Sequence, residues 1–86
     1  MFAKHLANEV GKHNIRVNCV TPSAIRNEWI EKFMSEEQIE QMTKMFPLGR
    51  IGELEDVAQA TAFLVSESAS WITGTRLDIS GGRIVI

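Results

Sequence analysis

Hydrophobic residues recur at helical spacing near the start of the chain and again in its second half. Residues 2–10 carry apolar side chains every third or fourth position, which predicts a helix with one apolar side, and Gly11 is expected to end that helix. Residues 54–66 include an acidic first turn that suits the positive end of a helix dipole, and nearly every position from 57 to 65 is apolar. A helix with this pattern is expected to be buried on more than one side.

The segment between these helices has a weaker helical pattern in two parts. A short helical piece is expected to pass through Trp29 and Phe33. A clearer helix is expected to begin at Ser35, because Ser35 and Gln38 have the spacing of a capping box, and to end before Pro47. The apolar side of this second helix consists of Ile39, Met42, Met45 and Phe46.

Two short segments have the alternating pattern of strands. The first is residues 15–20, and Pro22 is expected to end it because proline has no backbone N–H for the ladder. The second is residues 75–80, which the pair of glycines at 81–82 interrupts. A strand, helical segments and another strand in this order predict a parallel pair joined by a right-handed crossover.

Two parallel strands do not make a finished sheet. Parallel sheets are buried on both faces and rarely contain only two strands, and open strand edges need to be covered. The predicted fold class is therefore α/β, with the chain forming one end of a larger sheet and incomplete on its own.

Composition narrows the class of protein further. The 86 residues are 44% hydrophobic, which is typical of a globular domain, and the formal net charge of −2 excludes strong steering toward nucleic acid or an anionic membrane. No apolar stretch is long enough to cross a membrane, and the single Cys19 cannot form an internal disulfide, so a cytoplasmic protein is expected. His5 and His13 have no partner at metal-ligand spacing, and no metal site is predicted.

The segments "NIRVNCVTP" and "PLGRIGELEDVAQATAFLVSESASWITGTRLDISGG" closely resemble the C-terminal part of the short-chain dehydrogenase/reductase family. The resemblance runs from residue 2 to residue 82. It implies that residues 1–86 are the C-terminal segment of a single Rossmann-type domain with a doubly wound parallel sheet. Family members transfer a hydride between NAD or NADP and an alcohol or carbonyl carbon, so the resemblance implies that cofactor and a small-molecule substrate for the complete protein.

Two motifs of the family are absent from this sequence. The chain contains no tyrosine, so it has no Tyr-x-x-x-Lys motif, and residues 49–52 lack the spacing of the Gly-rich turn that holds phosphates. No catalytic residue is therefore assigned, and no turnover is expected from these residues alone. One hypothesis is a C-terminal fragment, truncation or mis-started reading frame of an NAD(P)-dependent oxidoreductase. The alternative is a non-catalytic dimerisation or subunit-interaction module derived from that family.

The turn after the first strand is the predicted cofactor-facing loop. It resembles the family pattern Pro-Gly-x-Ile/Val-x-Thr, which wraps over the nicotinamide so that backbone groups at the Ile/Val position meet the carboxamide. Pro22 and Ile25 match this pattern, whereas Ser23 replaces the glycine and Asn27 replaces the threonine. A positive φ would be strained at Ser23, while Asn27 keeps a donor and an acceptor. The alternative is a loop that only ends the strand.

Residues 26–46 resemble the substrate lid of the family. Its candidates for an apolar substrate pocket are Trp29, Ile30, Phe33, Met34 and Met42. The alternative is a pair of helices that pack these side chains against each other.

A homo-oligomer surface is implied for Val57–Val65 and Leu77–Ile79, with the chain's own core as the alternative role for both segments. Arg50 is expected to pair with one of its acidic neighbours rather than with a phosphate. Those neighbours are Glu53, Glu55 and Asp56.

Overall fold

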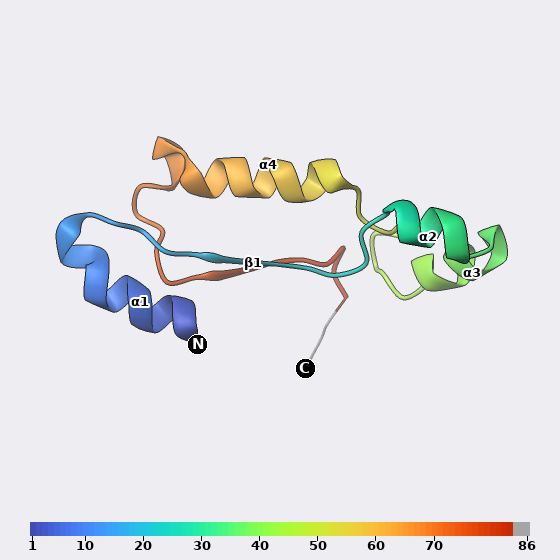
Figure 1. Cartoon of the computed structure of the whole chain (residues 1–86), viewed down its shortest axis with the longest axis horizontal. Helices are drawn as coiled ribbons and strands as arrows, with labels where there is room; N and C mark the ends of the chain where they lie inside the picture. Colours follow the sequence, from blue (N-terminus) through green and yellow to red (C-terminus); the bar gives the residue numbers. More distant parts are fainter. Residues whose placement is uncertain (84–86) are drawn as a thin grey trace.

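The structure is built on two short parallel strands. In the computed structural model, which describes residues 1–83, β1 (Cys19–Pro22) pairs with β2 (Arg76–Ile79) in a two-stranded parallel sheet. The two strands are joined by a long connection that contains three of the helices (Figure 1). The predicted α/β class and the parallel pairing are confirmed. The apolar residues at 84–86 lie outside the described residues.

The first strand lies further along the chain than predicted. The alternating pattern predicted residues 15–20, but the ladder begins at Cys19, because β2 starts only at Arg76, which is the partner of Cys19. Residues 15–18 therefore precede the ladder and have no strand partner in the described part of the chain. The alternating pattern located the strand to within a few residues, but the start of pairing depends on the other strand.

Pro22 belongs to β1, contrary to the expectation that it would end the strand. The N–H groups of Cys19 and Ser23 donate to the carbonyls of Thr75 and Ile79, at 2.9 and 3.1 Å. Alternate residues of a strand donate to the same side, so the nitrogen of Pro22 faces away from β2 and no ladder bond is lost.

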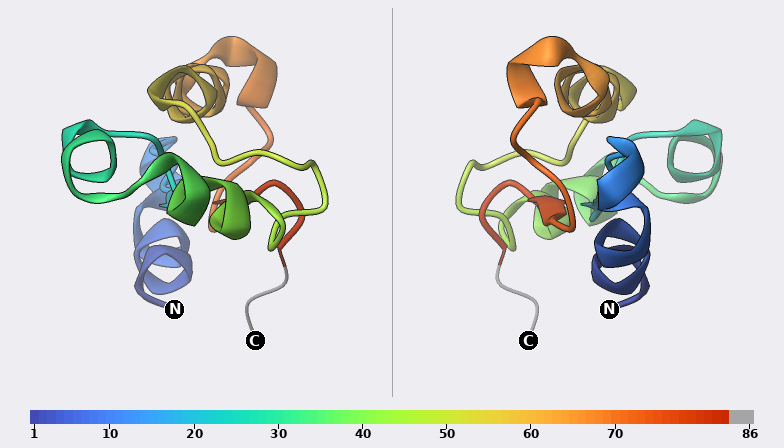
Figure 2. Two further views of the ribbon diagram at one scale, coloured as in Figure 1. Left: turned by 90° about the vertical axis from the view of Figure 1, so that its right-hand side faces the viewer. Right: turned by 90° about the vertical axis from the view of Figure 1, so that its left-hand side faces the viewer.

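Helices lie on both sides of the strand pair (Figures 1 and 2). The long helix α4 (Leu54–Val65) covers one face, and α1 (Phe2–Val10) lies on the other side. Two short helices, α2 (Glu28–Phe33) and α3 (Glu36–Thr43), lie beyond the carboxyl ends of the strands. Single turns of 3-10 helix follow α1 and α4, namely η1 (Gly11–His13) and η2 (Glu67–Ala69).

Two helix ends show how local chemistry shapes the chain. The side chain of Ser35 accepts from the Gln38 N–H at 3.1 Å and that of Gln38 accepts from the Ser35 N–H at 2.9 Å, so the predicted capping box is confirmed. Helix α1 does end before Gly11, but Gly11 keeps a right-handed backbone with φ −58°. The left-handed residue is Asn14, with φ 60°, and asparagine tolerates that conformation.

One arginine joins the segment that precedes β1 to the C-terminal end of α4 and to the loop that follows it. The guanidinium of Arg16 donates to the carbonyls of Leu64, Ile72 and Ser66, at 2.8, 3.1 and 3.3 Å. The last carbonyls of a helix have no partner within the helix, so a cation that donates to them satisfies acceptors and matches the helix dipole.

The compact core lies under α2 and α3 rather than between α4 and the strands. Its buried residues are Ile30, Phe46 and Ile51, which are 7%, 4% and 2% exposed. By contrast, Leu64 is the only residue of α4 that is buried within the described chain. Within these residues α4 is therefore buried on one side only, because only one face of the helix meets a strand, and burial of its other side stays a prediction.

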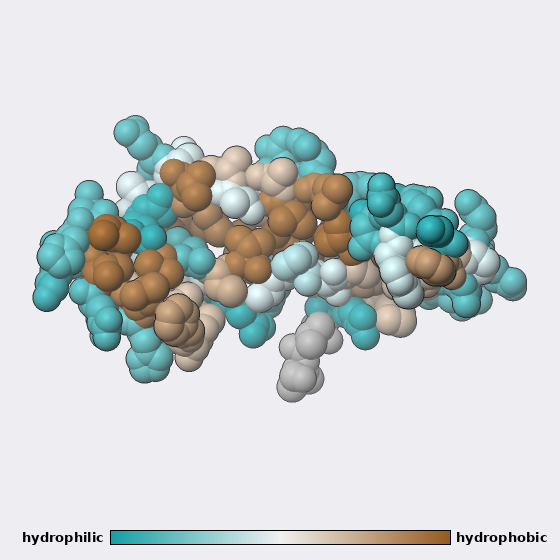
Figure 3. All heavy atoms as spheres, in the orientation of Figure 1, coloured by the Kyte–Doolittle hydropathy of each residue, from teal (hydrophilic) through white to brown (hydrophobic). Residues whose placement is uncertain are grey.

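Much apolar surface remains exposed (Figure 3), along α4, the strands and α1. The accessible area is 6662 Å², against about 5,100 Å² expected for a folded monomer of this size. The radius of gyration is 15.8 Å, against about 12 Å for a compact domain of this length. On α1, Ala3 and Ala7 are buried while Phe2 faces outward. These values confirm that the α/β unit is incomplete on its own.

Candidate functional site

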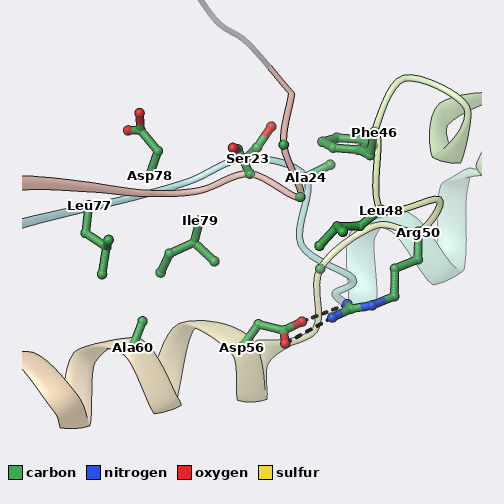
Figure 4. A pocket seen from close by; sticks show the side chains of 14 residues that line it. Ser23, Ala24, Phe46, Leu48, Arg50, Asp56, Ala60, Leu77, Asp78 and Ile79 are labelled. Atoms are coloured by element: carbon green, nitrogen blue, oxygen red, sulfur yellow. Dashed lines mark hydrogen bonds and ion pairs between the residues drawn. The ribbon is translucent and has the colours of Figure 1, made fainter.

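A cavity of about 510 Å³ lies where the two strands end (Figure 4). The carboxyl ends of parallel strands are the usual place for ligands in open α/β sheets. Four parts of the chain form its wall: the residues after β1, the end of β2, the loop before α4, and α4 itself. The lining residues include Ser23, Ala24, Phe46, Leu48, Arg50, Gly52, Asp56, Ala60, Leu77, Asp78, Ile79 and Ser80, with Gly81 and Gly82.

A backbone bridge joins the predicted cofactor loop to the loop before α4. Ile25 and Gly52 form an isolated parallel bridge, in which Gly52 N–H donates to Ala24 and Arg26 N–H donates to Gly52, both at 2.8 Å. A Cβ on Gly52 would lie 2.6 Å from Cδ1, the end of the flexible Ile25 side chain, and 3.4 Å from the carbonyl oxygen of Ala24.

An ion pair closes one side of the cavity (Figure 4). Arg50 Nη1 and Nη2 donate to the two carboxylate oxygens of Asp56, at 2.8 and 3.2 Å. This confirms the prediction that Arg50 pairs with an acidic neighbour. The Asp56 carboxylate also accepts from the Glu53 N–H at 2.8 Å, as part of the cap of α4. The Arg50 guanidinium, followed by that backbone N–H, lowers the pKa of Asp56 below its usual value.

This lowered pKa predicts a specific loss of stability in acid. Because the folded pKa of Asp56 lies below the unfolded one, the pair stabilises the folded chain above the unfolded pKa, and the effect disappears as the pH falls through the folded pKa. We expect the stability difference between the wild type and Asp56→Asn to be constant near neutral pH and to vanish in strong acid, as measured by urea unfolding at a series of pH values. A difference that stays constant throughout would contradict a role for the charge.

The predicted cofactor-binding residues surround the turn after β1 but have different environments. Pro22 is exposed, and Ser23 lines the cavity. Ile25 forms the bridge just described, and the side chain of Asn27 caps α2 by accepting from the Ile30 N–H at 2.9 Å. Among residues 1–83, Asn14 alone of the non-glycine residues has a positive φ, so serine in place of glycine at position 23 causes no backbone strain.

The bridge leaves the polar backbone groups of Ile25 itself unpaired. It uses the carbonyl of Ala24 and the N–H of Arg26, which point to one side. The N–H and carbonyl of Ile25 point to the opposite side and have no hydrogen-bond partner among the described residues. They offer a ligand one donor and one acceptor within a single residue.

The cap at Asn27 makes a further prediction about stability. Replacing Asn27 with alanine removes the acceptor for the Ile30 N–H, and we expect the free energy of unfolding to fall by about 1 kcal/mol. Asn27→Ser, which restores a capping oxygen, is expected to lose much less. Urea unfolding followed by circular dichroism measures both variants, and equal losses would show that capping is not the role of Asn27.

The five predicted lid residues separate into two groups. Ile30 is buried in the core, and Met34 and Met42 pack against it. Trp29 and Phe33 are each 62% exposed, and their ring centroids are 5.6 Å apart. None of the five lines the 510 Å³ cavity. Part of the lid thus packs against itself, as the alternative interpretation expected, while two aromatic rings face outward.

Sequence reasoning missed the contribution of the second loop to this site. Gly52 and the residues near Gly81 line the cavity, whereas their sequence pattern indicated only a turn without phosphate-binding spacing and the end of a strand. Asp56 was named only as a partner for Arg50. The available signal was that Gly49, Arg50, Gly52 and Asp56 lie close together in the sequence. Only the fold shows that this loop faces the end of β1.

The polar groups on the other side of the strand ends are also paired. Thr21 Oγ1 donates to the Asp78 carboxylate, and Arg76 Nε lies 3.1 Å from it. The Thr21 hydroxyl, followed by Arg76, lowers the pKa of Asp78. Both carboxylates near the cavity are thus stabilised as anions. No cluster of three potential metal ligands is found in residues 1–83, and no helix in that range is long and apolar enough to span a membrane.

Fold and site together define a class of protein: an α/β protein with a cavity at the carboxyl ends of parallel strands, which is the place where doubly wound sheets bind their ligands. A family model described as "Enoyl-(Acyl carrier protein) reductase" matches residues 1–83. The 3-oxoacyl-[acyl-carrier-protein] reductase FabG of Chlamydia trachomatis is 42% identical over 81 residues, which are 94% of this chain and 32% of that protein.

Solved structures agree with this match. The NADPH-dependent reductase YwfH, involved in bacilysin biosynthesis, aligns with a TM-score of 0.85 and 33% identity over 98% of this chain and 35% of its own. A short-chain dehydrogenase family protein from Francisella tularensis aligns with a TM-score of 0.86 and 33% identity, over 95% of this chain and 38% of its own. The chain belongs to the short-chain dehydrogenase/reductase family. It spans about a third of the length of the relatives that it matches.

Proposed function

We propose that this chain supplies the nicotinamide-facing loop and the substrate lid of an NAD(P)-dependent oxidoreductase that interconverts an alcohol and a carbonyl compound. The observation that supports this most is the unpaired N–H and carbonyl of Ile25, at the carboxyl end of β1. A nicotinamide carboxamide presents one acceptor and one donor in a plane, so it complements these two groups.

The residues around Ile25 fit the same group. The proposed cofactor-binding set is Pro22, Ser23, Ile25 and Asn27. Ser23 adds a hydroxyl at the edge of the cavity, and the Nδ2 of Asn27 remains a donor because capping uses only its carbonyl oxygen. When bound, NAD(P) would supply or accept the hydride, and the role of these residues is to bind and orient the nicotinamide.

Residues 26–46 are the proposed lid of this C-terminal segment of a Rossmann-type domain. Ile30, Met34 and Met42 hold the lid together through the shared core. Trp29 and Phe33 are the members of the predicted set that are exposed, and they are the proposed substrate contacts. The groups that exchange a proton with the substrate are proposed to come from outside these 86 residues, since the chain has no tyrosine.

The coding sequence upstream of Met1 tests the proposal most directly. An in-frame Gly-rich turn followed by a Tyr-x-x-x-Lys motif would support it, and stop codons close by in every frame would contradict it. The 86 residues alone are expected to show no turnover with NAD(H) or NADP(H) across simple alcohols and ketones. A reproducible rate would show that a reaction centre exists within this chain.

The second candidate function is a dimerisation or subunit-interaction module, and the exposed apolar residues of α4 favour it. Leu54, Phe63 and Val65 are 68%, 46% and 76% exposed. We propose Val57–Val65 and Leu77–Ile79 as a homo-oligomer surface, although Leu77 and Ile79 also point toward α4 within the chain (Figure 4). Sedimentation of the chain at micromolar concentration tests this: a folded dimer supports the module, whereas an unfolded or aggregated chain contradicts it.

A cytoplasmic location forms part of the proposal, because a single cysteine suits a reducing compartment. Fractionation of cells followed by immunodetection of the chain tests it. Recovery outside the soluble cytoplasmic fraction would contradict it.

A further inference from the structure

The loop that carries the proposed cofactor contacts is held in place by a second loop. Two backbone hydrogen bonds of 2.8 Å join them, one from the Gly52 N–H to Ala24 and one from the Arg26 N–H to Gly52. These bonds lie on either side of Ile25 and therefore set the direction of its own N–H and carbonyl. Gly52 approaches so closely that a Cβ there would lie 2.6 Å from Ile25 Cδ1.

The second loop is itself held by the Arg50–Asp56 pair, which we call the clamp (Figure 4). Arg50 Nη1 donates to the carbonyl of Ile51 at 3.1 Å, and the Asp56 carboxylate accepts from the N–H of Glu53 at 2.8 Å. The residues immediately before and after Gly52 are thus both hydrogen-bonded to the clamp. Two further bonds, at 2.8 and 3.2 Å, join the two side chains to each other.

The clamp also joins this loop to the longest helix of the chain. Asp56 lies in the first turn of α4, a helix of twelve residues that runs along one face of the strands. A bidentate arginine–carboxylate pair restricts orientation as well as distance, because its two bonds lie in one plane. The order of contact therefore runs from α4 to the clamp, from the clamp to Gly52, and from Gly52 to the backbone at Ile25.

We propose that Arg50 and Asp56 are positioning residues for the cofactor-facing loop, acting through Gly52. They hold the backbone of Ile25 in the orientation in which its N–H and carbonyl meet a planar amide. The identity of that amide as nicotinamide rests on the proposed function, whereas the clamp and the bridge are properties of the chain without any ligand.

Amide hydrogen exchange measured by NMR on the full 86-residue chain tests the clamp. The amides of Arg26 and Gly52 report on the bridge, and those of Cys19 and Ser23 report on the pairing of the two strands. In Asp56→Asn we expect at least tenfold faster exchange at the two bridge amides, with the two strand amides unchanged. Asp56→Glu, which keeps the carboxylate, is expected to recover part of the protection.

Glu55→Gln is the matched control, because Glu55 lies beside Asp56 and accepts only from the exposed Gln59 side chain in the described structure. It is expected to leave all four amides unchanged. Bridge amides that keep their protection in Asp56→Asn would overturn the inference. Equal acceleration of all four amides would also overturn it, because it would show general destabilisation rather than positioning.

Should Asp56→Asn give the spectrum of an unfolded chain, Arg50→Lys serves as the second variant, since lysine keeps the charge but loses the bidentate geometry. Exchange at the same four amides is then measured in Arg50→Lys, and the same results support or overturn the inference. No nucleotide is present in this experiment, so a failure of the clamp is distinguished from a failure of the proposed function, which the upstream sequence tests.

Discussion

Replacing Phe46 with alanine is expected to lower the free energy of unfolding by about 3–5 kcal/mol, the largest effect of any single substitution considered. Phe46 is 4% exposed and forms the core under α2 and α3 with Ile30 and Ile51. Its ring also lies against the position of Gly81, where a Cβ would be 3.5 Å from Phe46 Cδ1. Removing the ring leaves a cavity between the lid and the ends of the strands. The circular dichroism signal of the helices is therefore expected to disappear at a much lower urea concentration than in the wild type.

Phe33 offers a matched control for this prediction. It is also a phenylalanine of the lid, but it is 62% exposed and packs mainly on Trp29. Phe33→Ala is expected to lower the free energy of unfolding by less than about 1 kcal/mol, because the Phe33 side chain buries little apolar area. Similar losses in the two variants, measured by urea unfolding and circular dichroism, would contradict a core centred on Phe46.

Replacing Arg16 with alanine is expected to lower the free energy of unfolding by about 2–3 kcal/mol. The half-buried guanidinium donates to three backbone carbonyls near the end of α4, and hydrogen bonds from a charged donor contribute about 1.5–3 kcal/mol. Without Arg16, carbonyls of Leu64, Ser66 and Ile72 lose a donor. Urea unfolding at neutral pH measures the loss.

Arg76 provides the control for Arg16. Its side chain is 53% exposed and pairs with Asp78 on the surface, so Arg76→Ala is expected to cost at most about 1 kcal/mol. Arg16→Lys is expected to fall between the two alanine variants, because an ammonium group cannot reach all three carbonyls at once. An Arg16→Ala variant as stable as Arg76→Ala would show that the fastening of α4 does not matter for folding.

Local features of the structure were predictable because each depends on residues close in sequence. The capping box of Ser35 and Gln38 spans three positions, and the Arg50–Asp56 pair spans six. The ends of α4 followed from its acidic first turn and the long apolar run. The family resemblance, carried by ordered motifs, indicated the loop after β1 as a ligand-facing segment.

Other features depended on contacts between distant residues. Trp29 and Ile30 are neighbours with similar hydrophobicity, yet one is 62% exposed and the other 7%. A weak helical pattern cannot separate them, because the position of Phe46 decides which side faces inward. The start of β1 likewise depended on where β2 begins, more than fifty residues later.

The sequence by itself determined the helices, the parallel strand pair and the loop at the carboxyl end of β1, because hydrophobic spacing, caps and turn residues act over short distances. The tertiary structure alone decided that Gly52 pairs with Ile25 and that apolar residues of α4 remain exposed. Those outcomes depend on which segments meet in space, and a pattern along the chain does not contain that information.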